Sequence, residues 1–153
     1  MRALLLAYDG SDTARLAASF AIEMATLYSA ALHVLCVSGD RALGMGIDTE
    51  SVVDQEFKHC EDVLSELDLG GIEHTKSSVA IGSAAHEIIR YARENDIDHI
   101  VVGHRGHSLL DRWMIGSVSR HVVAFAPCAV TVIPDPQADA SNDHRAEAAE
   151  RGD

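Results

Sequence analysis

The chain has 153 residues, which is the usual size of one domain with its own core, and a formal net charge of −12 from 24 acidic and 12 basic residues. Such a chain lacks the basic surface that binding to nucleic acid or acidic lipid requires. No apolar run approaches the roughly 18 residues of a membrane span, and Tyr8-Asp9-Gly10 ends the apolar start too early for a secretory signal. We therefore expect a cytoplasmic protein without nucleic-acid binding or membrane insertion.

The first half of the chain alternates apolar runs with amphipathic helical patterns. Residues 3–8 are typical of a buried strand, and apolar residues at helical spacing follow up to about Ser29. Ser11 or Asp12 is a suitable N-cap for this helix. The next segments are predicted as a strand, a glycine-containing loop and a helix, at residues 31–37, 38–48 and 49–69.

The second half continues the same alternation and then changes in composition. It is predicted to contain strand, helix, strand, helix and strand, at residues 72–80, 83–95, 98–102, 117–126 and 128–133. Pro134-Asp135-Pro136 ends the last strand, and residues 137–153 contain no Val, Ile, Leu or aromatic residue. We expect one domain at residues 1–134 and a disordered acidic tail at residues 135–153.

Strands that are apolar on both faces and separated by helices predict a parallel sheet covered on both sides. The chain is therefore expected to form a three-layer α/β domain with five strands in the order 3-2-1-4-5. In such sheets, ligands bind beyond the carboxyl ends of the strands where the strand order reverses. Strand 1 delivers Asp9-Gly10-Ser11 to that point and strand 4 delivers residues 103–106, so two distant motifs are expected to meet there.

The segment between strand 4 and the last helix has features of an anion site. Gly103 and Gly106 allow close approach to the backbone, and Gly116 and Ser117 open a helix whose first amides have no intrahelical partner. Such amides carry partial positive charge and suit a phosphate, and the Ser117 and Ser119 hydroxyls add donors. Residues 103–121 hold three arginines and one aspartate, a local balance of +2. The P-loop pattern and G-x-G-x-x-G are absent, so this is a different phosphate cradle.

Each of these features also has an ordinary structural explanation. A lone Gly-x-x-Gly is common in loops, a Gly-Ser helix start is a common N-cap, and Asp9 could cap the helix that follows it. Arg112 and Arg120 could be solvated surface residues. Taken singly, none of the motifs establishes a function.

Metal and disulfide sites are disfavoured by the sequence. His104 and His107 form a pair without a third ligand. Cys36, Cys60 and Cys128 are odd in number and widely spaced, and they contain no C-x-x-C, so each is expected to be a small buried hydrophobic residue.

The glycine spacing Gly103-x-x-Gly106-x9-Gly116-Ser117, followed by Val118-Ser119, resembles the nucleotide-binding signature of the universal stress protein family, in its ATP-binding branch. Three further stretches, "LLAYDGSDTA", "IGSAAHEIIRYARENDIDHIVVG" and "APCAVTVI", are similar to that family's first strand and turn, third helix with fourth strand, and last strand. The likeness covers residues 2–134. It implies a Rossmann-like fold of the adenine nucleotide α-hydrolase type.

The resemblance also implies a set of binding residues. Ala7, Tyr8 and Asp9 would hold the adenosine part, and Val37 would meet the adenine through its backbone. The ribose and phosphates would lie against Gly103, His104, Arg105, Gly106, Gly116, Ser117, Val118 and Ser119. ATP is the implied ligand, with Mg²⁺ or Mn²⁺. His104 and Tyr8 depart from the commoner residues of the family, and this bears on the nucleotide preference.

The resemblance further implies a homodimer through the last strand, about Ala129 to Ile133. The function expected is an ATP-binding, nucleotide-dependent regulatory module of the stress response, which a protein partner reads. Hydrolysis is expected to be slow at most, since no catalytic base, P-loop lysine or arginine finger is evident.

Three alternative functions compete with this one. The first is a stress protein that does not bind ATP and acts as a dimeric interaction module. The second is an adenylating enzyme of the α-hydrolase group, which would need a glycine-rich S-G-G-x-D-S type loop where this chain has "DGSDTA". The third, a response-regulator receiver, fails because strand 3 ends in Ala80-Ile81-Gly82 without a phospho-acceptor aspartate.

Overall fold

The computed structural model describes residues 1–39, 49–104 and 115–135. Strands and helices alternate along these residues, in the order β1 (Ala3–Ala7), α1 (Asp12–Tyr28), β2 (Ala31–Ser38), α2 (Thr49–Ser65), β3 (Thr75–Ile81), α3 (Ala84–Glu94), β4 (His99–Gly103), α4 (Ser117–Phe125) and β5 (Ala129–Ile133). No helix in these ranges has the length and apolar content needed to cross a membrane. The tail expected at residues 135–153 falls outside the described residues, apart from Asp135.

The strands form one parallel sheet in the order β3-β2-β1-β4-β5, as the sequence predicted. The central strand β1 pairs with β2 on one side and with β4 on the other. The strand order reverses at β1. The chain places β2 and β3 on one side of β1 and then places β4 and β5 on the other side. The ends of β1 and β4 therefore bound the crevice in which ligands of such sheets bind.

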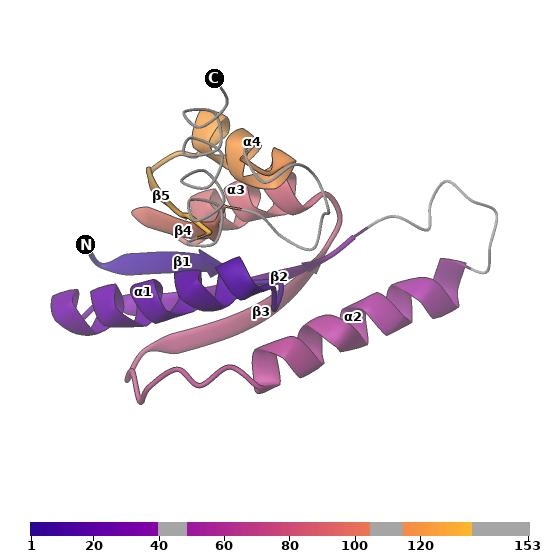
Figure 1. The fold of residues 1–153 in the computed structure, drawn as a ribbon, viewed down its shortest axis with the longest axis horizontal. Helices are drawn as coiled ribbons and strands as arrows, with labels where there is room; N and C mark the ends of the chain where they lie inside the picture. The colour runs from indigo at the N-terminus through magenta and orange to yellow at the C-terminus, as the bar shows by residue number, and fades with distance from the viewer. Residues whose placement is uncertain (40–48, 105–114, 136–153) are drawn as a thin grey trace, which may run out of the picture.

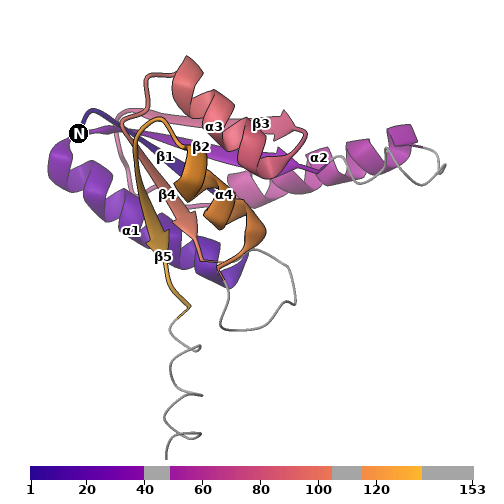
Figure 2. The ribbon, with the colours of Figure 1, turned by 90° about the horizontal axis from the view of Figure 1, so that it is seen from above.

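The helices cover both faces of the sheet and make three layers (Figures 1 and 2). Helices α1 and α2 lie on one face and α3 and α4 on the other. Alternate residues of β1 serve the two faces: Leu4 and Leu6, with Tyr8 directly after the strand, belong to the core cluster under α1, and Leu5 belongs to the cluster under α3 and α4. This two-sided burial explains why β1 is apolar throughout.

Several boundaries differ from the predicted ones by a few residues. The largest difference is at the end of α2, which stops at Ser65, whereas the apolar pattern predicted a helix up to residue 69. Leu67, Leu69 and Ile72 continue the apolar pattern because they cover the core cluster under α1, although they lie outside the helix. The next strand accordingly begins at Thr75, three residues later than predicted.

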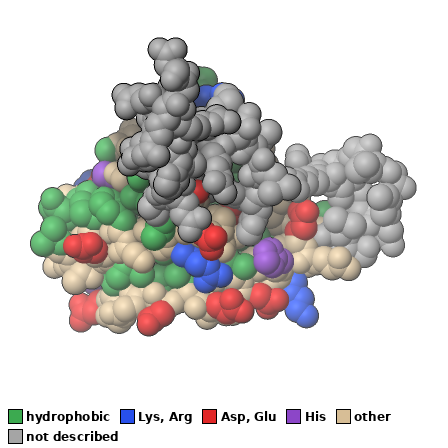
Figure 3. All heavy atoms as spheres, in the orientation of Figure 1, with side chains coloured by type: hydrophobic (Ala, Val, Ile, Leu, Met, Phe, Trp, Pro, Cys, Tyr) green, Lys and Arg blue, Asp and Glu red, His purple; other side chains and the backbone are tan. Residues whose placement is uncertain are grey.

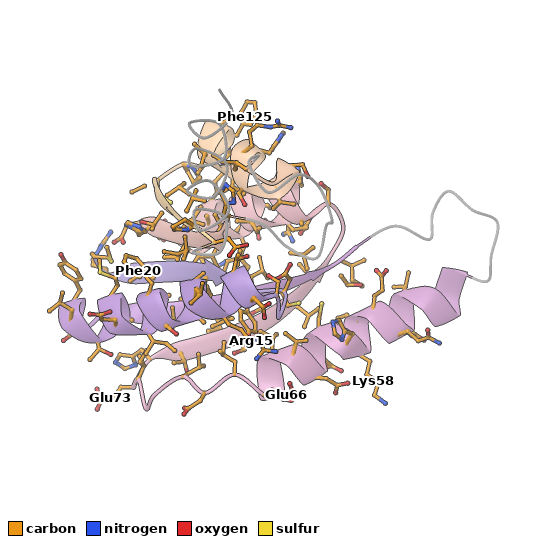
Figure 4. All side chains as sticks on the ribbon, in the orientation of Figure 1. Arg15, Phe20, Lys58, Glu66, Glu73 and Phe125 are labelled. Carbon is orange, nitrogen blue, oxygen red and sulfur yellow. The ribbon has the colours of Figure 1, made fainter. Side chains whose placement is uncertain are left out.

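The surface carries acidic side chains over α1 and α2, with basic ones placed singly between them (Figure 3). Exposed hydrophobic residues are found at the ends of two helices. Leu27 and Tyr28 are exposed at the end of α1, and Phe125 projects outward at the end of α4 with 58% of its surface accessible (Figure 4).

Candidate functional site

A pocket of about 110 Å³ lies at the reversal point of the sheet. Seven residues that the sequence predicted for the site line it: Ala7, Tyr8, Asp9, Val37, Gly103, Val118 and Ser119. They come from the ends of β1, β2 and β4 and from the first turn of α4. The fold therefore brings together motifs that are more than 90 residues apart in the sequence.

The turn after β1 is fixed by its own side chains. The backbone N–H of Ser11 donates a hydrogen bond to Asp9 Oδ1 over 3.0 Å. The Ser11 hydroxyl in turn accepts one from the amide of Ala14 at 3.3 Å, so Ser11 is the N-cap of α1. Of the capping residues considered, Ser11 is correct, and Asp9 supports the turn from outside the helix. This arrangement holds the Asp9 carboxylate at the edge of the pocket.

Gly10 is required by the same turn. Its φ of +77° lies in the left-handed region, and a Cβ there would come within 3.1 Å of Val63 Cγ1 of α2. A larger residue would meet a backbone penalty, and Val63 would have to move by a few tenths of an ångström to accommodate it. The turn that carries Asp9 is therefore in contact with α2 on the other side of the sheet from the pocket.

Gly103, at the end of β4, has a packing role that the sequence did not reveal. A Cβ at this position would lie 2.7 Å from Thr13 Oγ1 and 2.9 Å from the Thr13 carbonyl carbon. The first turn of α1 therefore packs directly on the end of β4, and only glycine leaves room for it. Buried alanines, including Ala14 and Ala17, allow the same close approach along α1.

Ser119 connects α4 to the end of β4. Its hydroxyl donates a hydrogen bond to the carbonyl oxygen of Gly103 at 2.7 Å, and its side chain is buried. The hydroxyl proton that the sequence suggested for a phosphate is thus used within the protein. Ser117 is exposed at the first position of α4, whereas Val118 and Ser119 line the pocket. By helix geometry, the amides of these first residues have no partner within α4.

A backbone hydrogen bond between His104 and Gly116 joins the two ends of the segment that connects β4 with α4. The His104 amide donates to the Ile133 carbonyl at 2.7 Å, and the Gly116 amide donates to the His104 carbonyl at 2.9 Å. The His104 Nδ1 atom is buried without a hydrogen-bond partner among the described residues. Neither residue lines the pocket itself. Arg105 and Gly106, also predicted for the site, lie outside the described residues.

Tyr8 and Val37 reach the pocket in different ways. Val37 packs against the core cluster under α3 and α4, on the face where the pocket opens. Tyr8 is only 4% exposed, and its side chain belongs to the cluster under α1. Its amide donates to the Leu35 carbonyl at 2.9 Å. The Tyr8 ring is therefore part of the core, so stacking on a bound base would require it to leave this position.

Five lining residues were not predicted for the site: Ala14, Leu35, Ala84, Ile88 and Val102. Strand alternation could have identified Leu35, because it points to the same face as Val37. The contributions of α3 depend on how that helix packs over the sheet, for which the sequence gives no signal.

A larger hollow of about 490 Å³ lies between α3 and β3 and contains none of the predicted site residues. Its charged side chains pair with one another: Arg90 bonds to Glu87 and Glu94, and Lys76 donates to Asn95 Oδ1 at 3.1 Å. Because these groups satisfy each other, the smaller pocket is the better candidate for a ligand. No cluster of three or more His, Cys, Asp or Glu residues that could hold a metal occurs in the described part of the chain.

The comparisons with known proteins decide the family. The model of the universal stress protein family matches residues 1–134. The chain belongs to the universal stress protein family. This membership confirms the resemblance inferred from the glycine spacing and the strand sequences.

Individual members of the family are similar over most of their length. A universal stress protein of Bacillus subtilis, YxiE, is 31% identical over 144 residues, covering 85% of this chain and 97% of its own. The structure of the universal stress protein UspA from Lactobacillus plantarum is 29% identical with a TM-score of 0.79, covering 86% of this chain and 97% of that one.

A more distant structure of the family carries a nucleotide. The universal stress protein from Archaeoglobus fulgidus in complex with dAMP is 22% identical with a TM-score of 0.55, covering 87% of this chain and 97% of that one. At 22% identity, this likeness establishes a shared fold and nothing further about this chain.

Proposed function

We propose that this protein binds an adenine nucleotide, with ATP as the expected ligand, and acts as a nucleotide-dependent regulatory module of the stress response in the cytoplasm. The observation that carries the proposal is the pocket at the reversal point, where Asp9, Gly103 and the first turn of α4 converge. The dAMP complex of a family member with the same fold supports an adenine nucleotide as the ligand class.

The two ends of the pocket suit the two ends of a nucleotide. Asp9 offers carboxylate oxygens, which accept hydrogen bonds from ribose hydroxyls. At the other end, Val118 and Ser119 place the start of α4 at the pocket, where amides with partial positive charge favour phosphate oxygens. The cavity of about 110 Å³ is smaller than the roughly 300 Å³ typical of small-ligand sites, so the phosphates would extend along α4 beyond it.

A divalent cation would bind at this site together with the phosphates of the nucleotide. Mg²⁺ is commonly held by one or two protein oxygens together with phosphate oxygens and water. Asp9, which lines the pocket, and the exposed Ser117 hydroxyl at the start of α4 are candidate oxygen ligands. Mg²⁺ or Mn²⁺ would neutralise phosphate charge beside an acidic protein. Hydrolysis is proposed to be slow at most.

The proposed assembly is a homodimer through β5. This strand forms one edge of the sheet, and within the described residues it pairs only with β4. Its residues from Val130 to Ile133 are half-buried in the single chain, and pairing with a second copy would cover the open edge. Sedimentation velocity should give twice the chain mass of 16.4 kDa. A monomer at micromolar concentration would contradict this assembly.

A second function, a dimeric interaction module without ATP, is favoured by two observations. Gly103 is explained by its packing on Thr13, and the Ser119 hydroxyl is explained by its bond to Gly103. Both motif residues therefore have structural reasons to be present.

Titration calorimetry of the nucleotide-stripped protein separates the two functions. ATP is titrated with and without Mg²⁺, and AMP is titrated in parallel. ATP binding that is much tighter than AMP binding supports the outer phosphates lying on α4. Equal affinities would locate the binding energy in the adenosine part. If neither nucleotide binds, the result favours the dimeric interaction module without ATP.

A further inference from the structure

The structure places two cysteine thiols in direct contact, although they are 24 positions apart in the sequence. Cys36 lies on β2 and Cys60 on α2, and the Cys36 thiol donates a hydrogen bond to Cys60 Sγ over 2.7 Å. Both side chains are buried, with 3% and 4% of their surface exposed. The sequence predicted Cys36, Cys60 and Cys128 to be small buried residues, which is confirmed for the first two, whereas Cys128 is only partly buried. The contact between Cys36 and Cys60 is a product of the fold.

We propose that Cys36 and Cys60 form an intramolecular disulfide under oxidising conditions, which ties α2 to the sheet. The two thiols lose two protons and two electrons as the S–S bond forms. The electrons reduce a low-molecular-weight disulfide, whose own S–S bond breaks to give two thiols. In the first step one cysteine thiolate attacks the small disulfide, forms a mixed disulfide and releases one small thiol. The thiolate of the other cysteine then attacks the protein sulfur of the mixed disulfide and releases the second small thiol.

The geometry suits this bond because the two sulfur atoms already face each other. A disulfide requires an S–S separation of about 2.05 Å. The sulfurs, now 2.7 Å apart, would therefore have to approach by about 0.65 Å. Such a movement is within the reach of a small tilt of α2, which lies along the outside of the sheet beside β2 and β3 (Figure 1).

The chemical environment makes this pair slow to oxidise. Burial raises the pKa of the Cys36 thiol, and the contact with Cys60 and the charge of Asp9 raise it further. The pKa of Cys60 is also raised, first by burial and then by Glu56 and Asp9, against the lowering effect of the Cys36 contact. Because the thiolate is the attacking species, exchange at neutral pH is slow and accelerates as the pH rises. The pair therefore responds to sustained oxidation.

The consequence is a more stable α2. Helix α2 packs on β2 and β3, and its Val63 lies beside the turn at Gly10. A disulfide between residues 36 and 60 closes a loop that includes the whole connection between β2 and α2. Closing such a loop restricts the unfolded chain, and by itself lowers the unfolding equilibrium constant roughly 300-fold. This effect is independent of nucleotide binding.

The test uses the full chain with Cys128→Ser as the background, so that two cysteines remain. The folded protein is incubated at pH 8.5 with mixtures of reduced and oxidised glutathione. A second sample is refolded from urea in the same mixtures, which gives the oxidant access to both thiols. After alkylation of free thiols, peptide mass spectrometry identifies the bonded cysteines, and urea unfolding compares the oxidised and reduced forms.

The expected result is a Cys36–Cys60 disulfide in both samples and a higher urea midpoint for the oxidised form. Cys36→Ala and Cys60→Ala in the same background should lose the shift in midpoint. In the native sequence, Cys128 should remain free for alkylation. The proposal is overturned if the two thiols stay reduced or end as glutathione adducts after refolding, if Cys128 pairs with either of them, or if oxidation lowers the urea midpoint.

Discussion

The Ser119 hydroxyl donates a hydrogen bond to the Gly103 carbonyl oxygen over 2.7 Å and so fastens the first turn of α4 to the end of β4. The same glycine packs against Thr13 at the start of α1. Gly103 is therefore the point at which a helix from each face of the sheet meets the central strands. The geometry of the pocket depends on this junction.

Replacing Ser119 by alanine should destabilise the protein. The buried Gly103 carbonyl would lose its side-chain donor, and an unsatisfied buried acceptor costs about 1–3 kcal/mol. Urea unfolding measures the loss. Ser117→Ala, two residues earlier and exposed, is the control and should change stability by much less. Equal stability of the two variants would show that the hydrogen bond contributes little.

Gly103→Ala tests the packing of α1 on β4. The new methyl group would lie 2.7 Å from Thr13 Oγ1 and 2.9 Å from backbone, which over-packs the junction at a cost of about 1–3 kcal/mol. Gly71→Ala provides a comparison, because its Cβ would meet no heavy atom within 4 Å but its φ is +75°. Gly71→Ala therefore measures a backbone penalty without packing, whereas Gly103 has no positive φ and its replacement tests packing alone. A Gly103→Ala protein as stable as the native one would contradict the close packing.

Gly116→Val should abolish ATP binding while the fold remains intact. The φ of −55° and ψ of 153° at Gly116 are accessible to any residue, so the branched side chain brings no backbone strain. It would instead occupy the space beside the start of α4 where the phosphates are proposed to lie. Calorimetry with ATP measures the loss. Ala124→Val, on the exposed side of the same helix, should bind ATP normally. Full affinity in folded Gly116→Val would refute the phosphate assignment.

Asp9→Asn separates the binding role of Asp9 from its structural role. Asparagine keeps an Oδ1 acceptor for the Ser11 amide, so the melting temperature should change little. Removing the charge weakens hydrogen bonds to ribose, and ATP affinity should fall roughly tenfold, as expected for a charged hydrogen bond. Affinities for AMP and ATP should fall together, because both nucleotides share the ribose. A loss confined to ATP would move Asp9 from the ribose to the phosphates.

Stability should decrease as the pH falls from 7.5 to 5.5. Burial lowers the pKa of His33, which Lys76 lowers further, and burial also lowers that of His99. Below the ordinary histidine pKa of 6.5, these residues are protonated in the unfolded chain before they are in the native one. Unfolding then takes up protons, so acid favours it.

The urea midpoint at the two pH values measures this effect. Replacing His33 by glutamine removes one of the two titrating groups and should flatten the pH dependence. His99→Gln removes the other titrating group and should also flatten the pH dependence. In the native protein, His99 Nε2 lies 2.8 Å from Thr131 Oγ1 and so connects β4 with β5. An unchanged pH profile in both variants would assign the acid sensitivity to other groups.

The sequence by itself determined the fold and most of the candidate site. Apolar runs on both faces of each strand require a covered parallel sheet, and alternation of strands with helices restricts its topology. The end of β1 and the glycine spacing indicated Asp9, Gly103 and the start of α4, and the resemblance to the stress protein family added Ala7, Tyr8 and Val37; all of these contribute to the pocket. These features are local or periodic, so they can be read from a chain without its three-dimensional contacts.

Only the tertiary structure decided what each side chain touches. Gly103 packs against Thr13, the Ser119 hydroxyl donates its proton to the Gly103 carbonyl, and Tyr8 lies in the core under α1. The tertiary structure also brought Cys36 and Cys60 together across 24 positions. Such contacts depend on how closely helices approach the sheet, which is set by the sum of many side-chain volumes and carries no periodic signal in the sequence.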